Sequence, residues 1–356
     1  MSLPLMRPQS LRPVLITGGA GFVGTNLAHR LLRAGRQVRI YDNLSRSGGQ
    51  QNLRWLRGVH GSRLQFHRGD VRNAADIRAV LADIGTVFHL AAQVAVTTSL
   101  ADPREDFTIN AGGTLNLLEE IRQANRPIGL IFTSTNKVYG ALEDIPLAAS
   151  SARYHPARDL CAIDETRPLS FYSPYGCSKG TADQYVLDYA RGYDVNATVF
   201  RMSCIYGPHQ YGTEDQGWVA HFLIQALQDL PITIYGDGKQ VRDLLYIDDL
   251  IDALLCAEDH LPQIAGQAFN IGGGLDNTMS LIEVIERITA LNGSPPVVAY
   301  GPWRVGDQRW YVSNPDKFER ATGWRPKTTL ESGLRGLYEW LSVNRRAVPA
   351  ARMAGT

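Results

Sequence analysis

Residues 14–24 read VLITGGAGFVG, and this stretch decides the fold. An apolar run leads into the glycines and predicts a buried strand, while the leucines at 27, 31 and 32 have helical spacing. Gly18, Gly21 and Gly24 match a GxxGxxG form of the dinucleotide-binding fingerprint. In that pattern glycines permit a tight turn, close approach of a pyrophosphate to backbone amides, and close packing of helix on strand. The stretch therefore predicts strand, turn and helix around a dinucleotide.

The second predicted strand, Gln37 to Tyr41, ends in Asp42. This is about the interval at which an acidic side chain binds the adenosine ribose in such folds. A carboxylate there repels the 2′-phosphate of NADP, so NAD is favoured, although the nearby Arg46 leaves NADP open. Asp42 could also be only a turn carboxylate at a strand end.

Two further predicted strands end in residues that suit a cofactor. LQFHRGDVR ends a third strand at Asp70, and VFHLAAQ ends a fourth at Ala91 and Ala92. Small residues let a cofactor lie against the strand ends. Asp70 fits an adenine contact, but an aspartate after a strand is also a common helix cap.

A second motif, SPYGCSK, begins at Ser173 and places Tyr175 one helical turn before Lys179. Ser173 is suited to cap a helix and Pro174 to its first position, so we predict a helix to about Tyr189. Side chains four apart share one helix face. An ammonium beside a phenol lowers its pKa, which makes the pair a candidate base for oxidising alcohols beside a nicotinamide.

Composition narrows the classes of function. The chain has 356 residues and a net charge of +1, with no basic stripe for nucleic acid and no apolar run near the roughly 20 residues that span a bilayer. The first residues lack the apolar core of a signal peptide, so we expect a cytoplasmic protein. No spacing of a metal site or disulfide framework links the cysteines at 161, 177, 204 and 256.

Alternating strands and helices to about Ser203 predict an α/β fold, a doubly wound parallel sheet of Rossmann type with a smaller C-terminal substrate lobe. The expected division is a dinucleotide-binding domain at 12–203, a mainly substrate-binding lobe at 204–345 with 243–257 packing back on the first, and loose tails at 1–11 and 345–356.

With these motifs in this order, the chain resembles the extended short-chain dehydrogenase/reductases that modify nucleotide sugars. Within that group it is most similar to the CDP-paratose 2-epimerases, also called CDP-tyvelose epimerases. The stretches that carry the resemblance are NLSR, QVAVTTS, GGTLNLLE, STNKVYG, SPYGCSKG, DQYVLDYAR, DQGWV, GKQVRD and GDQR. The resemblance implies NAD as cofactor and a CDP-sugar as substrate.

The resemblance also implies a catalytic trio of Thr135, Tyr175 and Lys179. Thr135 lies four residues before the tyrosine of VYG and could bind the sugar oxygen as it becomes a carbonyl, or merely satisfy a local amide. Lys179 is expected to lower the pKa of Tyr175 and to bind the nicotinamide ribose. The implied cofactor contacts are Gly18, Gly21, Phe22, Val23, Gly24, Asp42, Asn43, Asp70, Val71, Ala91, Ala92, Tyr175 and Lys179.

The residues after Thr135 separate related chemistries. Dehydratases of this group place Asp–Glu there and the decarboxylases a glutamate, whereas this chain has Asn136 and Lys137. Without those carboxylates an elimination of water lacks its general acid and base. Oxidation of one sugar carbon and its reduction from the opposite face need only the trio and NAD, and the family places that carbon at C2.

Substrate contacts follow the family pattern. Arg242 and Arg309 are expected to bind the diphosphate, or else to form structural ion pairs with Asp243 or Asp307. Cys204 replaces an asparagine that many relatives use, and could equally be a buried apolar residue. The expected substrate-binding residues are Thr135, Asn136, Cys204, Gln216, Arg242 and Arg309.

Two other functions stay open on the sequence: a UDP- or dTDP-hexose 4-epimerase of the same fold, and a non-catalytic protein that senses NAD or a nucleotide. A homo-oligomer, dimer or tetramer, is expected from two helices with apolar side chains at Leu115, Leu118 and Ile121 and at Tyr185, Leu187 and Tyr189. No metal site is expected.

Overall fold

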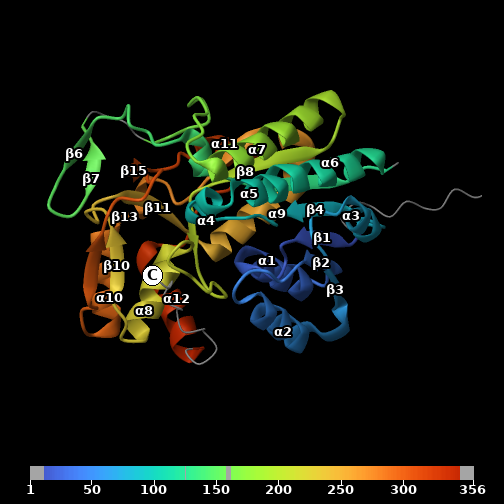
Figure 1. Ribbon diagram of the computed structural model, residues 1–356. Coiled ribbons are helices and arrows are strands. Elements are labelled where there is room, and N and C mark those ends of the chain that lie inside the picture. Colours follow the sequence, from blue (N-terminus) through green and yellow to red (C-terminus); the bar gives the residue numbers. More distant parts are fainter. Residues whose placement is uncertain (1–11, 125, 158–161, 345–356) are drawn as a thin grey trace, which may run out of the picture.

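The computed structural model describes residues 12–124, 126–157 and 162–344. Its centre is a sheet of seven parallel strands, which confirms the predicted fold class (Figure 1). In spatial order the strands are β12 (Ala268–Ile271), β8 (Ala197–Met202), β5 (Gly129–Thr135), β4 (Thr86–His89), β1 (Val14–Thr17), β2 (Val38–Asp42) and β3 (Leu64–Arg68). Strand order reverses between β1 and β4, which is where doubly wound sheets bind ligands.

Helices cover both faces of the sheet because its strands are apolar on both sides. Val14 and Ile16 of β1 pack toward one face, whereas Leu15 between them packs toward the other. The first face is covered by α1 (Phe22–Arg33), α2 (Gly49–His60), α9 (Ile247–Ile264) and α11 (Asp316–Thr322). The second is covered by α3 (Ala74–Val80), α6 (Gly113–Gln123) and α7 (Pro174–Gly192). The short helices α4 (Val96–Ala101) and α5 (Pro103–Phe107) lie against α7.

A second group of elements has a core of its own beside the carboxyl ends of the large sheet (Figure 1). Its strands are β9 (Cys204–Tyr206), β11 (Val241–Tyr246), β13 (Thr278–Ser280), β15 (Trp310–Tyr311), β10 (Ile232–Tyr235) and β14 (Val298–Gly301). Its helices are α8 (Trp218–Leu227), α10 (Leu281–Asn292) and α12 (Leu330–Val343), and a hairpin joins β6 (Leu147–Ala149) to β7 (Tyr154–Pro156).

The chain returns to the large sheet further along than the sequence indicated. Helix α9 packs on β5 and β8, and β12 then pairs with β8 in parallel, so the returning segment extends to Ile271. The place of β12 depends on its pairing with β8, which is distant in sequence, so no local pattern marked it. The division into two domains stays a prediction. No helix among the described residues is long and apolar enough to cross a membrane.

Helices α6 and α7, expected to pair between subunits, use much of their apolar surface inside the chain. Leu118, Ile121 and Tyr189 are buried in the core under the sheet, while Tyr185 is 43% exposed. The surface left for a partner is therefore smaller than the sequence pattern suggested.

Candidate active site

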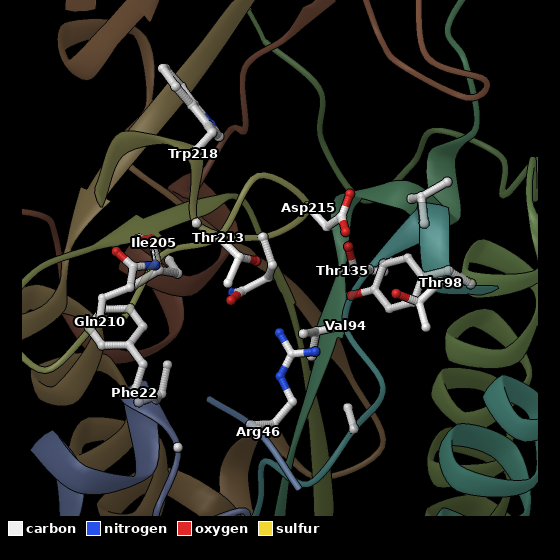
Figure 2. Close-up of a pocket in the computed structure, with 18 of the residues that line it drawn as sticks. Phe22, Arg46, Val94, Thr98, Thr135, Ile205, Gln210, Thr213, Asp215 and Trp218 are labelled. Carbon is white, nitrogen blue, oxygen red and sulfur yellow. Dashed lines mark hydrogen bonds between the residues drawn. The ribbon is translucent and has the colours of Figure 1, made fainter. Parts of the chain in front are cut away.

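A cavity of about 700 Å³ lies between the carboxyl ends of the large sheet and the second group of elements (Figure 2). The β1–α1 turn and the ends of β2, β4 and β5 line one side, together with the start of α7. Residues 202–222 and 304–307 line the other side. Segments distant in sequence thus meet at the point where the strand order reverses.

The glycine turn leaves backbone amides open at the start of α1. Its N-cap is Gly21, no side chain caps the helix, and no acidic residue lies in the first turn. A Cβ added at Gly24 would lie 2.5 Å from the carbonyl oxygen of Gly18, which itself has φ +69°. Because free amides at a helix start attract phosphate, the turn fits the pyrophosphate of NAD.

Asp42 at the end of β2 holds the glycine turn in place. Its Oδ2 accepts a hydrogen bond from Ala20 N at 3.0 Å, and its Oδ1 accepts one from Leu44 N at 2.7 Å. Burial raises the pKa of this carboxyl, and these two amides partly offset the rise. Asp42 is therefore a turn carboxylate, as the sequence allowed, and it also lines the cavity. Its contact with the ribose stays a prediction.

We expect Asp42→Asn to weaken NAD binding about tenfold, because an amide can accept only one of the two backbone hydrogen bonds and carries no charge for the ribose hydroxyls. Selectivity against NADP should fall as well, since the repulsion of a 2′-phosphate is lost. Calorimetric titration of both cofactors measures both effects. Asp76→Asn, on the acidic first turn of α3 and away from the cavity, is the control. Unchanged binding of both cofactors would exclude Asp42 from the cofactor site.

Residues just after β2 and β3 line the cavity beside Asp42. Asn43 Nδ2 donates to Asp70 Oδ2 at 2.9 Å, and the Arg72 guanidinium holds the pKa of Asp70 at about 2. The helix cap after β3 is Asn73 rather than Asp70, so the alternative of a capping aspartate was wrong. All the residues expected to contact the cofactor line the cavity: Gly18, Gly21, Phe22, Val23, Gly24, Asp42, Asn43, Asp70, Val71, Ala91, Ala92, Tyr175 and Lys179.

Tyr175 and Thr135 meet at the cavity wall. Ser173 caps α7 by accepting from Gly176 N at 3.1 Å, with Pro174 at the first position as predicted. Thr135 is the last residue of β5. Its hydroxyl accepts a hydrogen bond from Lys137 N at 3.3 Å, as the local-amide alternative predicted, and lies beside the Tyr175 phenol. Burial raises the pKa of Tyr175 to about 12, whereas Thr135 and the charge of Arg46 act to lower it.

Lys179 lies one turn along α7 but contacts a different group. Its Nζ donates to the Thr133 carbonyl oxygen at 2.6 Å and lies 4.2 Å from the centre of the Phe132 ring. Burial lowers the pKa of Lys179 to about 7, against the opposing charges of Asp183 and Asp106. This hydrogen bond ties the ammonium to a buried carbonyl of β5, and its expected effect on the pKa of Tyr175 stays a prediction.

On the substrate side the structure separates the two arginines. Arg242 lines the cavity, but its Nη2 pairs with Asp307 Oδ1 at 2.6 Å, so the ion-pair alternative holds for it. Arg309 is absent from the described cavity lining, and its guanidinium stacks near the Trp303 ring, 5.3 Å from its centre. This placement disagrees with the expectation that Arg309 binds the substrate. Asn136, Cys204 and Gln216 line the cavity as Thr135 does.

Two charged cavity residues, Arg304 and Lys137, were not among the expected site residues. Arg304 lies 3.8 Å from the centre of the Tyr235 ring and pairs with Glu214. Lys137 donates to Gln308 Oε1 at 3.3 Å, and burial lowers its pKa to about 8. The sequence holds a weak signal for Lys137, which lies two residues after Thr135, and none for Arg304.

Comparison with known proteins places this site in a family. Residues 14–272 match the model of the NAD dependent epimerase/dehydratase family. The chain is 43% identical to a CDP-paratose 2-epimerase of Salmonella typhi, over 92% of this chain and 99% of that protein. It is 31% identical to a UDP-glucose 4-epimerase of Mycolicibacterium smegmatis, over 92% of this chain and 97% of that one.

Solved structures of epimerases also resemble this chain. A Thermotoga maritima UDP-glucose 4-epimerase with UDP-glucose superposes with a TM-score of 0.80 at 31% identity, covering 95% of this chain and all of that one. A Bacillus cereus UDP-glucuronic acid 4-epimerase in complex with UDP-glucuronic acid and NAD gives 0.80 at 29% identity, covering 93% and 99%.

Proposed function

The chain belongs to the NAD dependent epimerase/dehydratase family, and we propose that it inverts C2 of CDP-paratose to give CDP-tyvelose. It is an NAD-dependent enzyme that acts on a nucleotide sugar. The 43% identity to a CDP-paratose 2-epimerase exceeds that to the UDP-glucose 4-epimerases and supports this substrate.

One observation at the site carries the proposal. Thr135 and Tyr175 meet at the cavity wall, but the two residues after Thr135 are Asn136 and Lys137. A carboxylate pair that could drive elimination is therefore missing at this position. What remains is a single phenol able to exchange one proton with a sugar hydroxyl, which is the requirement of a simple epimerisation.

We assign the steps to residues as follows. The Thr135 hydroxyl holds the sugar oxygen, and Tyr175 Oη removes the hydroxyl proton and later returns it. Bound NAD would supply acceptance of the hydride from that carbon and its return. The open amides at the start of α1 and the carboxylate of Asp42 hold the cofactor's pyrophosphate and ribose. Arg242, paired with Asp307, and Arg304, paired with Glu214, line the substrate side of the cavity.

Proton NMR of CDP-paratose with the purified enzyme and catalytic NAD tests the substrate. Inversion at C2, seen in the anomeric and H2 signals without accumulation of NADH, is the expected result. If CDP-paratose stays unchanged while a UDP- or dTDP-hexose is inverted at C4, the enzyme is a 4-epimerase of the same fold and the proposed substrate is wrong.

We also propose a homo-oligomer, a dimer or tetramer, and a cytoplasmic location. The exposed rings of Tyr185 and Tyr193 on and just after α7 support an interface there, and sedimentation velocity tests it. The thiols of Cys177, Cys204 and Cys256 are free, which is compatible with a reducing compartment. Cys161 lies outside the described residues.

A further inference from the structure

The loop between β2 and α2 directs Arg46 into the cavity. At its start, Asp42 and Asn43 accept hydrogen bonds from Leu44 N at 2.7 Å and Ser45 N at 3.0 Å. Leu44 has φ +60°, a left-handed conformation that a leucine rarely adopts. The loop is thus held in an unfavourable conformation by two side-chain contacts at its first residues.

The other end of the loop is fixed by the second group of elements. Gly48 has φ +82° and lies so close to the Tyr211 ring that a Cβ there would overlap it. Gly49 N donates to the Arg46 carbonyl oxygen at 3.1 Å. With both ends fixed, the Arg46 side chain points across the cavity toward Asp215 and Thr135, as Figure 2 shows. The side chain therefore extends toward Thr135, and this orientation adds nothing to the NADP alternative that the sequence left open.

Each element packed around Tyr175 places a polar or charged group near it. Thr135 of β5 lies beside the phenol, Ser99 of α4 accepts from the Tyr175 backbone amide at 3.1 Å, and Asp106 of α5 adds negative charge. Lys179 is held at Thr133. Arg46 extends toward Thr135, and its charge acts to lower the pKa of the phenol.

The charges of Lys179 and Arg46 respond differently to pH. Burial lowers the pKa of Lys179 to about 7, so the charge of its ammonium is sensitive to pH. A guanidinium stays protonated at every pH at which a protein is folded. Asp215 faces the Arg46 guanidinium across the cavity.

We propose that Arg46 is a positioning residue of the epimerisation, whose fixed positive charge faces Tyr175 and favours the ionised phenol that removes the sugar proton. The inference rests on the proposed function for the role of Tyr175. The loop geometry places the Arg46 side chain in the cavity, and the groups around Tyr175 identify the phenol as the group on which its charge acts.

The test compares Arg46→Gln with Arg46→Lys and a control, Arg54→Gln, which removes a charge from the exposed face of the neighbouring helix. We expect Arg46→Gln to lower kcat about tenfold at pH 7 and to move the ascending limb of the pH profile of kcat about one unit toward alkaline pH. Arg46→Lys should restore part of the shift, and Arg54→Gln should match the wild type. Added salt should shrink the difference, because Arg46 is open to solvent in the cavity.

A second readout separates this inference from the choice of substrate. The phenolate absorbance of the NAD-bound enzyme is titrated with pH, and the curve of the Tyr175→Phe variant is subtracted for each background. Arg46→Gln should move the difference curve toward alkaline pH whatever the substrate is. A higher KM with both the pH profile and the difference titration unmoved would make Arg46 a substrate contact and overturn the proposal. A shifted titration without turnover of CDP-paratose would retain the proposal and reject only the substrate.

Discussion

Tyr175→Phe is expected to reduce turnover by about 10³-fold or more while leaving NAD bound. The phenol lines the cavity beside Thr135 at the predicted catalytic position, and a positioned acid/base contributes about 10²–10⁴-fold. The phenyl ring keeps the packing of this buried side chain, so the fold should change little. Single-turnover kinetics and calorimetric titration of NAD measure the two effects separately.

The matched control is Tyr185→Phe, which removes a hydroxyl from an exposed position of the same helix, α7. Its turnover should equal that of the wild type. If Tyr175→Phe kept turnover within tenfold of the wild type, the proton would have to move through another group, and the assignment of Tyr175 as acid and base would be wrong.

Asp183→Ala is expected to give the largest loss of stability. Both oxygens of this fully buried carboxylate accept hydrogen bonds from Arg201, at 2.9 Å from Nε and 2.9 Å from Nη2, and Arg201 is itself buried. Removing one partner leaves an uncompensated guanidinium in the core, which costs about 3–5 kcal/mol. The pair joins α7 to β8, so its loss should also disturb the helix that carries Tyr175.

Urea denaturation measures the change in the free energy of unfolding. The control is Asp188→Ala on the same helix, whose carboxylate is 66% exposed and pairs with Arg191 at 3.6 Å. An exposed pair of this kind contributes about 0–1 kcal/mol, so this variant should stay close to the wild type. Equal effects of the two substitutions would show that the buried pair does not anchor α7.

What the sequence could predict was set by local chemistry. Three features depend only on residues close to them in sequence, so a single sequence is enough to predict them. They are the glycines of the β1–α1 turn, the aspartate that ends β2 and the Ser173–Pro174 start of α7. The strands of the large sheet were predictable for the same reason, apart from β12, whose place depends on pairing with β8, a strand distant in sequence.

The partners of charged side chains could not be predicted, because they depend on which segments the fold brings together. Lys179 reaches a carbonyl 46 residues earlier, and Arg242 pairs with a carboxylate 65 residues later. Arg304 and Arg309 lie in one short stretch, yet only the first lines the cavity. The position of Arg46 likewise depends on Tyr211, far along the chain.

The measurement that tests the central claim most directly uses CDP-paratose carrying deuterium at C2, incubated with the enzyme and catalytic NAD in ordinary water. If the same hydride leaves and returns to one carbon while Tyr175 moves only the hydroxyl proton, the CDP-tyvelose formed should keep its deuterium at C2, as NMR and mass spectrometry would show. Replacement of that deuterium by hydrogen from water would mean that C2 is inverted by removing its proton, and would contradict the mechanism.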